Sequence, residues 1–180
     1  LTMRLAVSSE RTVNGSPVDH FYVRRFGVPE MAGRATHLAY AGSRMFESVG
    51  ADIQDPDLVA DVRISSVGDY GYYTAVSRYT LGILPSFSGE IFQVETTIKD
   101  SSGTIVFHDI REERPVHVRT FPRVSTFTGP LRIDLFSAGR VAERIIYDLN
   151  REALYQFYFQ EAWDQAVAAR NAHAPVPAAE

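Results

Sequence analysis

The chain has no cysteine, and this absence removes several kinds of chemistry at once. Disulfide bonds, thiol nucleophiles and cysteine-ligated metal centres are all excluded. Lysine is nearly absent as well, since Lys99 is the only one among 18 basic residues. The net charge of -4 gives no general attraction for nucleic acid or anionic lipid. We therefore expect no binding to nucleic acid.

Long apolar runs and the common catalytic signatures are also missing from the sequence. No stretch reaches the ~18 apolar residues that a transmembrane helix requires. The nucleophile elbow G-x-S-x-G, the phosphate loop G-x-x-x-x-G-K-[ST], the dinucleotide fingerprint G-x-G-x-x-G and the zinc motif H-E-x-x-H do not occur. We therefore expect no enzyme activity and no bound cofactor.

Two groups of residues are candidates for a metal or acid–base site, and neither has a suitable pattern. His108 and Asp109 are neighbours on a predicted strand, so their side chains point to opposite faces of a sheet. The densest acidic cluster lacks the central Gly and the bidentate Glu of a calcium-binding loop. It consists of Asp52, Asp55, Asp57 and Asp61. Solvated surface positions explain both groups more simply, and we expect no metal site.

The clearest structural pattern is a long β-hairpin. Alternating apolar and polar residues at 90–100 and 104–110 predict two strands, and the turn at 101–103 ends in Gly103. Residues 115–121 extend the second arm beyond a kink at Pro115. Residues 1–9 and 59–66 alternate in the same way, and weaker patterns predict strands at 20–26 and 74–83. Residues 121–130 are expected to form a loop.

Two stretches have helical periodicity. Apolar residues recur at steps of three and four between residues 29 and 50, and Gly50 is a typical helix stop. A second helical region covers 133–170 in one or two pieces, and Asn150 is the expected position of a break. Residues 171–180, rich in Ala and Pro, predict a disordered tail. Residues 1–170 thus form a single α+β domain: an antiparallel or mixed sheet with helices on one face and a long C-terminal helical region.

The C-terminal helical region contains an unusual aromatic segment, LYQFYFQEAW, at residues 154–163. Its apolar arc is too wide for one buried stripe. Three explanations are open: packing on two sides within the monomer, a dimer or partner surface rich in aromatic residues, or a lipid headgroup boundary. The flanks are not basic, which argues against lipid. The candidate interaction surface comprises Tyr155, Tyr158, Phe159 and Trp163.

Several turns and strand starts resemble those of uncharacterised soluble domains of bacterial envelope lipoproteins. The matching motifs are F-x-x-V-G at 46–50, A-D-V at 60–62, LGILP at 81–85 and D-x-x-G at 100–103. The opening strand and helix are also similar to the amino-terminal domain of TolB. The resemblance implies a location in the periplasm or at the outer membrane, with membrane contact only through a lipid anchor ahead of Leu1. These positions are architectural, so no functional residue is transferred.

These observations lead to two functional hypotheses. The first is a non-enzymatic envelope protein, a lipid-tethered interaction or assembly module that binds a protein partner or a second copy of itself. The alternative is a small-molecule or lipid carrier with an apolar pocket. A closed apolar cavity would favour the carrier, whereas a filled core with an exposed aromatic patch would favour the interaction module.

Overall fold

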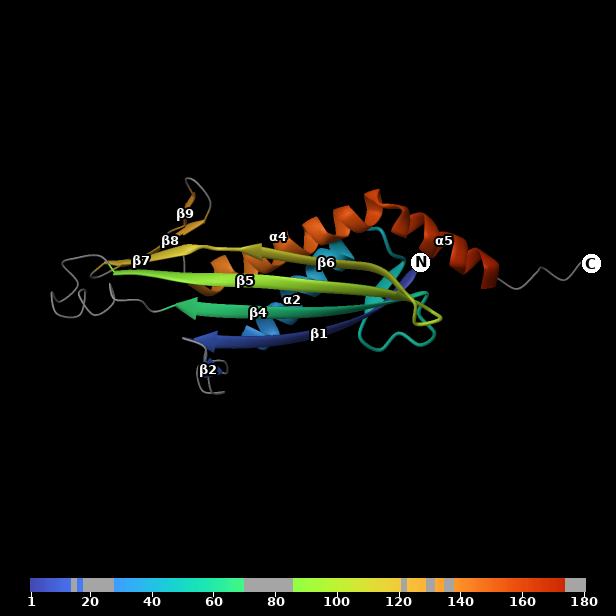
Figure 1. Ribbon diagram of the computed structural model, residues 1–180, viewed down its shortest axis with the longest axis horizontal. Coiled ribbons are helices and arrows are strands. Elements are labelled where there is room, and N and C mark those ends of the chain that lie inside the picture. The colour runs from blue at the N-terminus through green and yellow to red at the C-terminus, as the bar shows by residue number, and fades with distance from the viewer. Residues whose placement is uncertain are drawn as a thin grey trace, which may run out of the picture.

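The computed structural model describes residues 1–13, 16–17, 28–69, 86–120, 123–128, 132–134 and 138–173. These residues form a mixed sheet with helices packed on one of its faces (Figure 1), which confirms the predicted α+β class. The predicted strands at 20–26 and 74–83, and the LGILP motif at 81–85, lie outside the described residues.

The sheet contains one long parallel pair among antiparallel neighbours. Its strands are β1 (Thr2–Val13), β2 (Ser16–Pro17), β3 (Ser48–Gly50), β4 (Leu58–Asp69), β5 (Ser86–Asp100), β6 (Ile105–Glu113), β7 (Val116–Thr120), β8 (Arg123–Thr128) and β9 (Arg132–Asp134). The path through the sheet is β2-β1-β4-β5-β7-β8-β9, with β3 on β1 and β6 on β5. β1 runs parallel to β4, because the chain crosses over between them through helix α2 (Val28–Gly42).

The predicted hairpin is confirmed as β5 and β6, paired from Phe92 with Glu113 to Lys99 with Ile105. The Asp100 N–H donates to the Thr104 carbonyl at 2.9 Å, and the Asp100 carboxylate accepts from the Ser102 and Thr104 N–H groups. Gly103 has a φ of 87°, a conformation that side chains disfavour. Beyond Pro115, β7 extends the second arm along the first residues of β5, as the sequence predicts.

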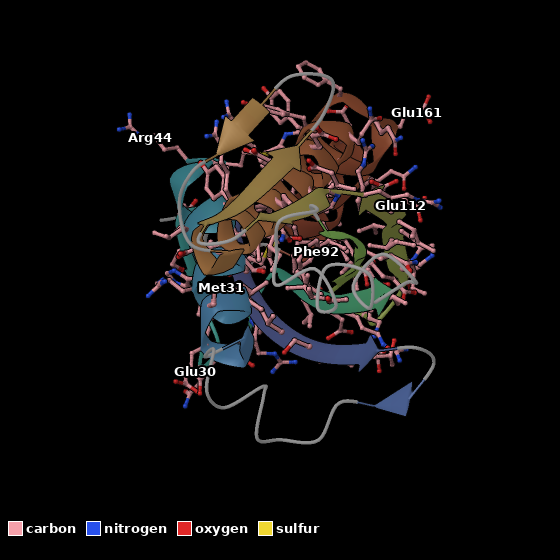
Figure 2. The ribbon with its side chains drawn as sticks, turned by 90° about the vertical axis from the view of Figure 1, so that its left-hand side faces the viewer. Glu30, Met31, Arg44, Phe92, Glu112 and Glu161 are labelled. Carbon is pink, nitrogen blue, oxygen red and sulfur yellow. The ribbon has the colours of Figure 1, made fainter. Side chains whose placement is uncertain are left out.

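The core lies between the sheet and two long helices, α2 and α4 (Ala138–Phe159), which pack side by side. Alternate residues of β4 from Leu58 to Ser66 and of β5 from Phe92 to Ile98 point into it, including the predicted inward residues Ala60, Val62 and Ile64. Viewed end on (Figure 2), Met31 and Phe92 lie between the layers, while Glu112 lies outside. No described helix covers the opposite face of the sheet.

The first helix is shorter than predicted: α2 ends at Gly42 instead of continuing to Gly50. The Ser43 hydroxyl donates to the Tyr40 carbonyl at 2.7 Å, and Arg44 adopts a φ of 58° that breaks the helical path. The chain then enters β3, which pairs parallel with the start of β1. Phe46 is nevertheless buried, with its ring 6.4 Å from that of Tyr40. The apolar spacing therefore extends beyond the end of α2 because residues after the helix also pack into the core.

The second helical region also differs from its prediction. Residues 132–134 form strand β9, residues 123–128 form strand β8 instead of a loop, and α4 begins only at Ala138. Asn150 does not break the helix, because its amide donates to the Ile146 carbonyl at 2.7 Å and to the Thr36 hydroxyl at 3.3 Å in the core. The break falls at Gln160, between α4 and α5 (Glu161–His173). Residues 174–180 lie outside the described residues.

Candidate interaction surface

The aromatic segment lies at the junction of α4 and α5, and the structure divides its residues into buried and exposed sets. Leu154 and Phe157 are buried in the core. Tyr155 and Tyr158 are 46% and 47% exposed, and Phe159 is 80% exposed. Trp163, on the first turn of α5, is half-buried. The predicted interaction residues therefore lie together on the outside of this junction.

A cluster of packed rings anchors the exposed residues. The Phe157 ring lies 5.5 Å from that of Phe107 and 5.8 Å from that of Trp163, both edge to face. Trp163 in turn lies 5.5 Å from Tyr158, which lies 5.4 Å from Phe159. Such pairs add stabilisation beyond the area they bury. Tyr158 thus packs on the half-buried Trp163, and Phe159 packs on Tyr158. These contacts restrict the two rings, so they would lose less side-chain entropy when a partner binds.

Arg151 completes the outer face of α4. Its guanidinium donates to the Tyr155 hydroxyl at 2.7 and 3.1 Å and lies 5.2 Å from the centre of the Tyr155 ring. The hydrogen bond to Tyr155 raises the pKa of Arg151 above its ordinary value. The patch therefore carries a permanent positive charge at one end beside its apolar rings, a composition typical of protein interfaces.

Strand β6 lies next to this part of α4. Arg111 on β6 contacts Asp109 at 2.6 Å and Glu152 on α4 at 3.2 Å, and its bond to Asp109 raises its pKa. Two exposed isoleucines, Ile105 and Ile110, lie on the same strand. Of the seven large exposed apolar side chains among the described residues, five lie on β6 or on the last two turns of α4. The contribution of β6 was not predicted from the sequence, although apolar residues on both faces of this strand were a signal.

The open face of the sheet has a different character. A shallow depression of about 430 Å³ lies on it, lined by Ala6, Val7, Ser8, Asp61, Val62, Arg63, Glu95 and Thr97. Ion pairs cross this face: Lys99 with Asp61 at 2.7 Å and Arg63 with Glu10 at 2.9 Å. An open surface lined by charged groups does not suit an apolar ligand.

The candidate metal residues do not converge, and His108, Asp109, Asp57 and Asp61 each interact with another side chain. His108 is exposed on one face of β6, where its Nδ1 lies 3.1 Å from the Thr97 hydroxyl, while Asp109 on the other face binds Arg111. Asp57 accepts hydrogen bonds from the N–H and hydroxyl of Thr2 at 2.6 and 3.0 Å. Among the residues that the structure describes, no three His, Asp or Glu side chains converge on a point suitable for a metal ion.

No family model matches the chain, and no curated protein matches it. Among solved structures it is similar to a neuraminyllactose-binding hemagglutinin homolog from Helicobacter pylori, with a TM-score of 0.46 and 6% identity, covering 95% of this chain and 90% of that one. It is also similar to rare lipoprotein B from Shewanella oneidensis, with a TM-score of 0.30 and 15% identity, covering 94% of this chain and 96% of that one. Both TM-scores are below 0.5.

A direct membrane span is not found in the described helices. None of them is both long and apolar enough to cross a bilayer.

Proposed function

We propose that this chain is a non-enzymatic interaction module that binds a protein partner through the aromatic end of α4. The observation that supports the proposal is the placement of Tyr155, Tyr158 and Phe159 on the surface above a buried aromatic cluster. A Phe ring that is 80% exposed contributes little to the stability of the monomer, whereas its burial against a partner would contribute about 1.5–3 kcal/mol to binding.

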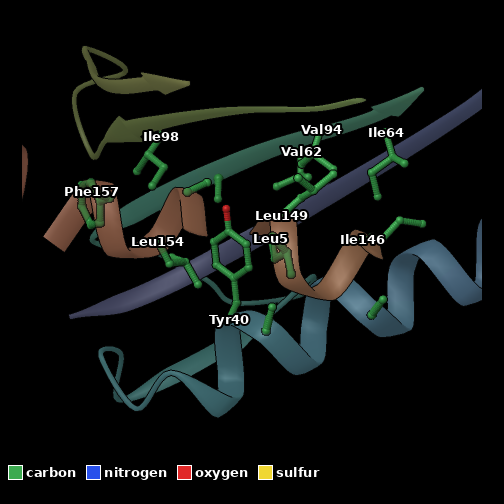
Figure 3. Close-up of a cluster of buried hydrophobic side chains, with 14 of the residues drawn as sticks. Leu5, Tyr40, Val62, Ile64, Val94, Ile98, Ile146, Leu149, Leu154 and Phe157 are labelled. Atoms are coloured by element: carbon green, nitrogen blue, oxygen red, sulfur yellow. The ribbon is translucent and has the colours of Figure 1, made fainter. Parts of the chain in front are cut away.

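The interior of the protein supports a module more than a carrier. The space between sheet and helices is occupied by side chains from both layers, and the Tyr40 ring reaches from α2 toward the sheet among Leu5, Leu149 and Leu154 (Figure 3). The charged depression on the open face is not an apolar pocket. Among the described residues, side chains from both layers pack in the core and aromatic rings are exposed at the end of α4, the combination expected of the interaction module.

We further propose that the module works in the bacterial cell envelope, tethered by a lipid on a preceding segment. The support is the resemblance of its turn motifs to those of envelope lipoproteins. The test is to read the complete coding sequence for a lipid-attachment cysteine after a signal peptide, and to fractionate cells that express the full-length protein. A full-length protein recovered from the cytoplasmic fraction would contradict this location.

The partner proposal is tested by site-specific photo-crosslinking in cells of the source organism. A photoreactive phenylalanine analogue at position 159 is compared with the same analogue at Leu38, an apolar residue on α2 that is 52% exposed. We expect a defined protein adduct from position 159 and none from position 38. Equal labelling at both positions, or adducts with lipid alone at position 159, would contradict the proposal.

A further inference from the structure

We propose that the outer edge of β6 pairs antiparallel with β6 of a second copy, around a two-fold axis at Ile110, so that two sheets join into one. This inference goes beyond the proposed function, because it names a second copy of the chain as the partner and β6 as the element in contact. It begins with the edge itself. β6 has 9 residues and pairs with β5 on one side, while no described strand pairs with its other side. Figure 1 shows β6 at the margin of the sheet.

With respect to the described strands, residues 105–112 of this edge present about 26 Å of backbone N–H and C=O groups. Charged side chains on an edge normally oppose pairing with another chain. On β6, however, two charges of opposite sign, Asp109 and Arg111, flank the apolar Ile110, and a hydrogen-bonding His108 and an acidic Glu112 lie beyond them. The sequence from His108 to Glu112 reads His, Asp, Ile, Arg, Glu. This arrangement complements itself when the strand is turned end for end.

In the register centred on Ile110, each Ile110 lies opposite its copy. Asp109 then lies opposite Arg111 of the second copy, and His108 lies opposite Glu112 of the second copy. The two-fold axis repeats both contacts. Directly opposed pairs of opposite charge or apolar character stabilise strand pairing, whereas like charges disfavour it.

Neighbouring registers are worse. A register centred on Asp109 places two carboxylates opposite each other, and one centred on Arg111 places two guanidinium groups opposite each other. The Asp109–Arg111 ion pair at 2.6 Å within each chain would become part of a four-membered network of alternating charge. The charge pattern therefore selects both the second copy as the occupant and a single register.

Apolar side chains also lie near this edge on both faces of the sheet. Ile110 is 52% exposed on the side of β6 away from the helices. On the helix side, Glu152 of α4 reaches Arg111, and Phe159 lies seven residues further along α4, on the same side of that helix. Ile110 on the open face and Phe159 on the helix side thus lie on either side of the edge strand.

The test uses the absence of cysteine from the chain. Ile110→Cys places two thiols opposite each other on the two-fold axis, and mild oxidation should convert most of the protein to a disulfide-linked dimer. Val67→Cys is the matched control, because Val67 is 41% exposed but lies on β4, an interior strand. Unsubstituted protein should sediment at twice the monomer mass. Ile110→Asp, which opposes two carboxylates, should weaken dimerisation at least about tenfold without lowering the melting temperature of the monomer.

A monomer at all concentrations, equal crosslinking of the two cysteine variants, or a dimer unaffected by Ile110→Asp would overturn the inference. These outcomes are separable from a failure of the proposed function. A monomer that still forms a defined protein adduct at position 159 would refute the β6 dimer and leave the interaction module standing.

Discussion

Phe157 and Phe159 are two residues apart on α4, and substituting each of them by Ala should change the free energy of unfolding by very different amounts. Phe157 is fully buried and contacts the Phe107 and Trp163 rings at 5.5 and 5.8 Å, whereas Phe159 is 80% exposed. Truncation of a buried Phe to Ala costs about 3–5 kcal/mol through lost burial and a residual cavity. An exposed substitution away from such packing changes stability by about 0.5 kcal/mol or less.

These values translate into a direct measurement. With a urea m-value of about 2 kcal/mol/M, Phe157→Ala should lower the unfolding midpoint by roughly 2 M, while Phe159→Ala should leave it nearly unchanged at low protein concentration. If Phe159 lies at an interface, its variant should lose stability only at concentrations where the unsubstituted protein associates. Equal losses for both variants at every concentration would refute the division of the aromatic segment into core and surface.

The remaining predictions concern single residues. Gly103→Ala should destabilise by about 1–2 kcal/mol because of its positive φ, whereas Gly33→Ala, in open space within α2, should stabilise by about 0.5–1 kcal/mol; opposite signs in urea unfolding would show that the backbone argument is wrong. Burial raises the pKa of Asp57, but hydrogen bonds from Thr2 outweigh it and hold the pKa below its ordinary 3.8. The stability from Asp57 is therefore present above pH 3.8 and is lost as the pH falls through its native pKa, so the unfolding free energy of Asp57→Asn should depend less on pH in that range. Among the described residues, the buried hydroxyls of Tyr40 and its neighbour Thr96 make no hydrogen bond of regular geometry, so Tyr40→Phe should be neutral or stabilise by up to about 1 kcal/mol; a clear loss of stability would show that the hydroxyl is satisfied.

The hairpin could be predicted because its determinants are local. Alternation along β5 and β6 follows from the two-residue period of a strand, and Gly103 marks the turn through its own backbone freedom. The inward residues of β4 follow from the same period. The helix ends could not be predicted in this way. Phe46 keeps the apolar spacing of α2 beyond Gly42 because it enters the same core from a different backbone conformation.

Asn150 illustrates how a tertiary partner reverses a local preference. Its side chain competes with backbone groups and is typical of helix ends. In the fold, Thr36 on α2 and the Ile146 carbonyl accept hydrogen bonds from its amide, so the residue remains buried in the middle of α4. The parallel pairing of β1 with β4 is likewise a long-range contact without a local signature.

The sequence by itself therefore determined the α+β class, the main hairpin, the inward faces of its strands and the aromatic character of the α4–α5 junction. Only the tertiary structure decided which aromatic rings face solvent and which strand forms an open edge. The physical reason is that strand alternation and turn geometry depend on neighbouring residues, whereas exposure depends on what the rest of the chain packs against. Tyr155 and Phe157 have similar side chains, but Phe157 packs against Phe107 of β6 and is buried, whereas Tyr155 is 46% exposed.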